Sequence, residues 1–272
     1  MQKSQIIAIA AGLVLVIALY NLPKAIINKT DKEKLGSNQA ELPQKAILNN
    51  KKISEKDLKE ITELRKLYNN SKDIKKYANF ADSLAKKFVS LALFDSAASY
   101  ADKLVLSHRG DYMCLKTAGN IYFTIYSSIS DPSKANPFAE KAREFYQSYL
   151  KSDSLNLTIR NNMAMTYVVS NTPMQAIMEL RKILVVEPQN VQAQTNLGLL
   201  AMQSGQYDKA VNRFKTLVET DNNNWNAKYY LALSLIETGK KQDAKELLKD
   251  ISEHSSDLNL MADAKNTLST ID

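Results

Sequence analysis

Residues 191–224 read VQAQTNLGLLAMQSGQYDKAVNRFKTLVETDNNN, and this stretch decides the fold. Small residues stand at Gly198, Ala201 and Ala210, and apolar residues recur around them at the three- and four-residue spacing of α-helices. Gly205 interrupts the pattern between its two halves, as expected for a turn. The stretch therefore predicts two antiparallel helices, with small residues where the helices approach closely and larger residues filling the space between them.

The same pattern recurs along the chain. Alanines with equivalent surroundings stand 45, 34, 34 and 34 residues apart, at Ala97, Ala142, Ala176, Ala210 and Ala244. This period divides the chain into five segments, which are 78–111, 112–156, 157–190, 191–224 and 225–258. The second segment is 11 residues longer than the others. We predict that its extra residues, near 127–137, form a surface loop because they include two prolines.

These segments resemble tetratricopeptide repeats (TPRs). In the clearest segment the residues that carry the resemblance are Leu197-Gly198, Ala201, Gly205, Tyr207, Ala210, Phe214 and Leu217. The resemblance implies an all-α fold, a right-handed helical solenoid of about five repeats with flanking helices. Ser54 is a candidate helix N-cap, so we predict an N-terminal helical cap at 54–77. We also predict a C-terminal capping helix at 259–272.

The chain begins with a long apolar run. Residues 6–22, IIAIAAGLVLVIALYNL, carry no charge and would span about 25 Å as a helix, enough for a single membrane crossing when the flanking lysines reach the interfaces. A cleaved signal peptide and a buried core helix are the alternatives, but no small-x-small cleavage site ends the run. We therefore predict an N-terminal transmembrane helix within a membrane anchor at 1–28, with anchor residues Ile6, Leu13, Leu15, Ile17 and Tyr20.

Positive charge is concentrated beside this run. Residues 24–77 hold 14 Lys/Arg against 8 Asp/Glu, whereas residues 78–272 hold 21 of each. A neutral repeat region argues against nucleic-acid binding, and a basic polar tether at 29–53 suits an anionic membrane surface. Lysines after the run outnumber the one before it, which favours a single-pass protein of the bacterial inner membrane with its repeats in the cytoplasm and leaves the periplasm as the alternative.

The residue inventory also limits the chemistry. The lone cysteine, Cys114, and the two distant histidines, His108 and His254, cannot form a disulfide or a cysteine-based zinc site. Cys114 is expected to be a packed core residue. Anchor, tether, repeats and caps account for the 272 residues, so we expect no enzyme, no catalytic residue, no metal and no cofactor.

The resemblance also implies a partner site. In this family, side chains at fixed positions of each repeat's first helix line a concave groove. The corresponding groove residues here include Lys116, Asn120, Asn161, Asn162, Gln192, Thr195, Asn196 and Tyr229. Amide side chains both donate and accept hydrogen bonds, so they suit the backbone of an extended peptide. The alternative is that these residues are only a solvated face of the array.

A narrower version of this site is a carboxylate clamp. Lys116, Asn120 and Asn162 match the residues with which chaperone-adaptor members grip a C-terminal carboxylate, but Gln192 and Asn196 stand where that clamp has two cations. We therefore favour a neutral groove for an internal peptide. The predicted function is a membrane-anchored scaffold for a protein or peptide partner. The alternatives are an accessory subunit of a membrane enzyme or of a translocon or envelope-assembly complex, and a structural protein that self-associates.

Overall fold

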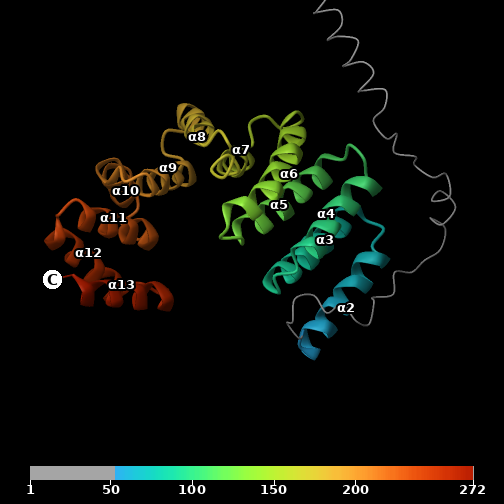
Figure 1. The fold of residues 1–272 in the computed structure, drawn as a ribbon, viewed down its shortest axis with the longest axis horizontal. Coiled ribbons are helices and arrows are strands. Elements are labelled where there is room, and N and C mark those ends of the chain that lie inside the picture. Colours follow the sequence, from blue (N-terminus) through green and yellow to red (C-terminus); the bar gives the residue numbers. More distant parts are fainter. Residues whose placement is uncertain (1–52, 272) are drawn as a thin grey trace, which may run out of the picture. The chain divides into compact units, whose positions relative to one another are not determined.

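The computed structural model describes residues 53–271 (Figure 1). The predicted anchor, and the predicted tether apart from Ile53, lie outside the described residues. Residues 53–271 form twelve helices and no strand, which confirms the all-α prediction. No helix in this part of the chain is long and apolar enough to cross a membrane.

The helices follow one another with short connections. Their bounds are α2 (Glu55–Asn70), α3 (Ile74–Ser90), α4 (Phe94–Ser107), α5 (Tyr112–Ser127), α6 (Pro132–Leu150), α7 (Leu157–Met165), α8 (Met174–Val186), α9 (Val191–Gln203), α10 (Tyr207–Thr220), α11 (Trp225–Glu237), α12 (Lys241–His254) and α13 (Leu258–Thr270). Each helix packs against the next one along the chain. Five helix pairs, from α3–α4 to α11–α12, are flanked by α2 before them and α13 after them.

Short polar side chains start the first helix of most pairs. Asp111, Asn156, Asn190 and Asn224 each precede such a helix and accept a hydrogen bond from the backbone N–H three residues on. This cap satisfies one of the four N–H groups that a helix start leaves without a partner. The recurrence of the cap at each repeat boundary explains why helices begin there.

Small residues allow the paired helices to approach closely. The five repeated alanines are fully buried. Gly198 of α9 lies against the ring of Phe214 of α10, and a Cβ atom at Gly198 would stand 2.5 Å from the Phe214 Cζ. Gly119 of α5 faces Tyr146 of α6 in the same way, since a Cβ atom there would stand 2.6 Å from the Tyr146 Cδ1. Each glycine therefore makes room for an aromatic ring that fills the core of its pair.

The prediction of a surface loop near 127–137 is wrong. Helix α5 continues to Ser127, and α6 begins at Pro132, so most of the extra residues extend α6 to 19 residues. Asp131 caps this helix by accepting from the backbone N–H of Ser133 at 2.9 Å. Proline suits the first helical position because its missing N–H would have had no partner there. Pro137 lies inside the helix, although the sequence pattern alone treats it as a break.

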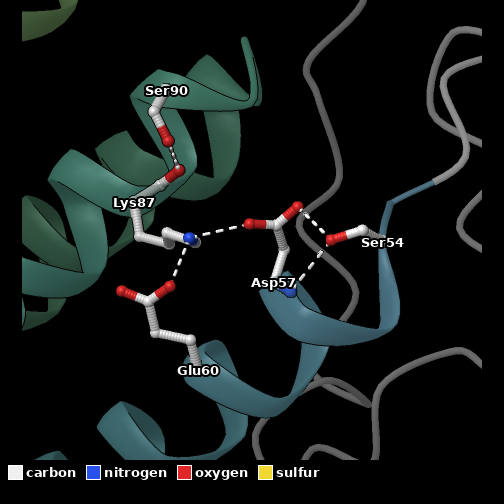
Figure 2. A network of polar contacts seen from close by, with 5 residues as sticks. All are labelled: Ser54, Asp57, Glu60, Lys87 and Ser90. Carbon is white, nitrogen blue, oxygen red and sulfur yellow. Dashed lines mark hydrogen bonds and ion pairs between the residues drawn. The ribbon is translucent and has the colours of Figure 1, made fainter.

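A polar network holds the first described helix on the array (Figure 2). The Lys87 ammonium of α3 pairs with the Asp57 carboxylate of α2 at 2.8 Å and also with Glu60. Ser54 caps α2 by accepting from the Asp57 backbone N–H, and its hydroxyl donates to the Asp57 carboxylate. Hydrogen bonds from Lys87 and Ser54 lower the pKa of Asp57, and the two carboxylates raise the pKa of Lys87. Helix α2 is thereby fixed where the chain enters the array.

Candidate functional site

The candidate site lies among the first helices of the repeats. Helix α5 meets α7 through the Tyr126 hydroxyl, which donates to the Met165 carbonyl. Two adjoining hollows of about 480 and 470 Å³ lie at this place and share Phe123 and Asn162. Helices α3, α5 and α7 line the first hollow, and α5, α7 and α9 line the second. We call this region the α5–α7 joint.

The joint lies beside an unusually short helix. Helix α7 has nine residues, whereas α9 and α11 have 13. After Met165 the backbone turns more tightly, because the N–H groups of Thr166, Tyr167 and Val168 bond the carbonyl three residues back instead of four. The regular helix therefore ends early, in a tighter turn.

Side chains of α5 and α6 add hydrogen bonds to the end of α7. The Tyr126 hydroxyl donates to the Met165 carbonyl at 2.8 Å. Arg143 donates to the Thr166 hydroxyl at 3.1 Å and to its carbonyl at 2.9 Å, and the guanidinium lies 4.2 Å from the centre of the Tyr167 ring. Thr166 is fully buried, so these bonds replace water that cannot reach it. Arg143 thus ties the end of α7 to α6.

The amide oxygens of the joint are already engaged. The Asn120 Oδ1 accepts from the Tyr146 hydroxyl at 2.9 Å, and the Asn162 Oδ1 accepts from the Gln192 Nε2 at 3.3 Å. The Asn161 Oδ1 accepts from the Asn196 Nδ2 at 3.1 Å. Each amide nitrogen carries two N–H groups, so Asn120 and Asn162 keep donors for a ligand. Burial raises the pKa of Tyr146, whose hydroxyl stays protonated as a donor.

Charges at the joint largely balance. Lys116 lies with its ammonium 5.9 Å from the centre of the Tyr149 ring, and Lys86 pairs with Asp82 at 2.7 Å. The pKa of the nearby Asp153 is lowered by hydrogen bonds from Asn156 and Tyr149, with a smaller contribution from the charge of Lys116. The joint therefore combines donor groups and two lysines, one of them in an ion pair, with little net charge.

The structure brings most of the predicted groove residues to this joint. Lys116, Asn120 and Asn162 line the first hollow, and Asn161, Asn162, Gln192 and Asn196 line the second. Asn161 is only 1% exposed, so it supports the site from within instead of presenting an open amide. Tyr229 lies apart, because its hydroxyl is 3.2 Å from the Thr267 hydroxyl of α13, and Thr195 lines neither hollow.

Two charged lining residues are absent from the predicted groove set. Asp82 and Lys86 of α3 border the first hollow. They occupy the fifth and ninth positions of the segment 78–111, so the groove rule finds them when it is extended to that segment. Cys114 lies elsewhere, in the core, where burial raises the pKa of its thiol to about 12 and keeps it a neutral packing group.

The comparisons agree with this architecture. The family model described as tetratricopeptide repeat matches residues 201–268. A TPR protein from Parabacteroides merdae has 15% sequence identity, with 78% of this chain and 79% of that chain covered at a TM-score of 0.56. A thermophilic TPR protein from Thermus thermophilus has 16% identity, with 65% and 89% covered at a TM-score of 0.52. No curated protein sequence matches the chain.

The matched repeat model, the recurring helix pairs and these similar folds define the class. Residues 201–268 match the tetratricopeptide-repeat model, and the described helix pairs share the fold of solved tetratricopeptide-repeat proteins. Sequence identities of 15% and 16% relate these solved structures to the chain by fold alone.

Proposed function

We propose that the array is a protein-binding scaffold and that the α5–α7 joint holds an extended segment of its partner. The observation that carries this proposal is the pair of adjoining hollows bordered by α5 and α7, whose lining includes amides, two lysines and one aspartate. Together they offer a length of surface that a single pocket would not.

The chemistry of the joint suits a peptide backbone. An extended peptide presents carbonyl oxygens along its length, and Asn120, Asn162 and Lys116 retain donors for them. Phe123 and Met165 lie beside the amides and offer contact for apolar side chains. Lys86 is paired with Asp82, which leaves Lys116 as a single cation for a ligand and favours an internal segment over a terminal carboxylate.

The membrane anchor is the second part of this proposal. The uncharged run at 6–22 would hold the scaffold at a bacterial inner membrane, and the lysines that follow it favour a cytoplasmic array. Carbonate washing should leave the protein in the pellet with its N-terminus intact. Recovery in the wash, or a mature start beyond Leu22, would remove the anchor from the proposal. An alkaline phosphatase fusion at Asp272 that is active in the periplasm would reverse the orientation.

Capture of a partner tests the joint directly. We would purify the tagged full-length protein in mild detergent, identify bound proteins by mass spectrometry, and map the bound segment with overlapping peptides. The Lys116→Ala, Asn162→Ala double variant should bind that segment about tenfold more weakly, since each lost hydrogen bond contributes ~0.5–1.5 kcal/mol. Asn120 is left unchanged because its substitution would strand the buried Tyr146 hydroxyl.

The matched control is Lys215→Ala with Asn226→Ala, two exposed residues of the same types outside the joint. Both double variants should melt at nearly the wild-type temperature. If the control weakens binding as much as the joint variant does, the joint is not the binding site. Recovery of only the chain itself would favour the self-associating alternative.

A further inference from the structure

A third hollow lies among the second helices of the repeats. It measures about 620 Å³ and is lined by α4, by Arg109 of the following connection and by Phe145 of α6. None of the helices that line the α5–α7 joint contributes a residue to it. It is therefore a separate surface, and an inference about it does not depend on the proposed function of the joint.

Apolar side chains dominate this hollow. Val105 and Leu106 of α4 line it together with Phe145 of α6. Phe145 is nearly buried and stacks on Tyr122 at 5.7 Å between ring centres, so it forms a fixed part of the wall. Leu106 is 65% exposed, although burial of a leucine side chain is favourable. A partner side chain in the hollow would remove this exposed surface from water.

Two cations stand beside the apolar wall. Lys103 and Arg109 line the hollow, and neither takes part in an ion pair within residues 53–271. The Lys103 ammonium lies 5.0 Å from the centre of the Tyr100 ring. The one carboxylate of the lining, Asp102, accepts a hydrogen bond from the Tyr122 hydroxyl at 2.8 Å. The lining thus carries an excess of positive charge next to an apolar surface.

We propose that this hollow docks a segment of a partner protein in which a large apolar side chain is flanked by acidic residues. The apolar side chain would lie against Leu106, Val105 and Phe145. The acidic residues would pair with Lys103 and Arg109, and arginine is well suited to hold a carboxylate through two parallel hydrogen bonds. The array would then contact partners on two surfaces formed by different layers of helices.

A selection from random peptides tests this surface while the partner is unidentified. Phage carrying random 12-residue peptides would be selected on the full-length protein in detergent, and the recovered peptides would be titrated by fluorescence anisotropy. We expect acidic peptides with a central leucine or phenylalanine, and Leu106→Asp should weaken their binding at least tenfold. The Lys116→Ala, Asn162→Ala variant should bind these peptides like the wild type, which separates this site from the joint.

Reversal of the two positive charges tests the proposal most sharply. Lys103→Glu with Arg109→Glu should abolish binding of the acidic peptides and select basic ones with the same apolar centre. Lys215→Glu with Lys249→Glu makes the same change in charge on exposed residues of other second helices and should leave binding unchanged. The proposal is overturned if acidic apolar peptides are not selected, or if they bind the reversed variant as tightly as the wild type. It is also overturned if this surface instead joins two copies of the chain, which light scattering would show as a dimer that Leu106→Asp converts to a monomer.

Discussion

A single turn position shows how individual residues adapt to the repeat. Gly205 and Gly239 stand at the fifteenth position of their segments and have φ angles of 70° and 78°. Ala92 stands at the same position of the segment 78–111 and has a φ of 57°. A side chain in this left-handed region is strained, because its Cβ crowds the following carbonyl oxygen. The geometry of the repeat therefore overrides the preference of the alanine.

Ala92→Gly should stabilise the protein. Relief of the left-handed alanine gains ~1–2 kcal/mol, and the greater freedom of glycine in the unfolded chain returns ~0.4–1 kcal/mol of that gain. We expect a net increase of roughly 0.5–1 kcal/mol in the free energy of unfolding, measured by urea denaturation. Gly205→Ala, the reverse change at the equivalent turn, should destabilise. An Ala92→Gly variant that is less stable than the wild type would show that the left-handed turn costs nothing here.

At the scale of the elements, some helices can be predicted from the sequence and others cannot. Helices of the segments around Gly198 and Ala244 follow from the apolar period and the asparagine caps, because both signals are local. The extension of α6 through Pro137 does not follow, since a proline normally ends a helix and only packing with α5 reveals that it does not. The early end of α7 is equally hidden, because it depends on partners in two other helices.

The attachment of α2 should weaken in acid. The pKa of Asp57 is lowered in the folded state by Lys87 and Ser54, so the carboxylate stabilises the docked helix above the ordinary aspartate pKa of ~3.9. This stability is lost as the pH falls through the ordinary value toward the lowered one. Hydrogen exchange of residues 55–70 should therefore accelerate between about pH 4 and pH 3 relative to intrinsic rates. Asp57→Asn should show fast exchange at both values, and a wild type without this acceleration would contradict the linkage.

The Arg143 contact should hold the end of α7. Arg143→Met removes two hydrogen bonds from a charged donor and leaves the buried Thr166 carbonyl without its partner, which should cost ~1–3 kcal/mol of unfolding free energy. Hydrogen exchange of residues 163–170 should increase most. Lys141→Met, on the same helix but exposed and paired only with Glu144, is the control and should change stability little. Equal effects of the two changes would mean that α7 is held by packing alone.

At the scale of the whole molecule, the sequence predicts an all-helical repeat protein because the same pattern of small and apolar residues recurs in several segments. Six of the eight predicted groove residues line the joint, since their positions in the repeat place them on first helices. The joint itself was not predictable, because it lies beside the early end of α7, which the repeat pattern does not reveal. Tyr229 lies away from the joint, because it is on α11, where its hydroxyl contacts Thr267 of the last helix, α13.

The most direct test of the central claim is site-specific photo-crosslinking at the joint. A photoreactive amino acid in place of Thr158, an exposed residue that lines the first hollow, should crosslink in cells to one short segment of a partner protein. The same amino acid in place of Asn226, exposed on α11 and outside both hollows, should give no such product. The Lys116→Ala, Asn162→Ala background should remove the Thr158 product. Crosslinks that form equally at Asn226, or that persist at Thr158 in that background, would contradict the assignment of the joint as the partner site.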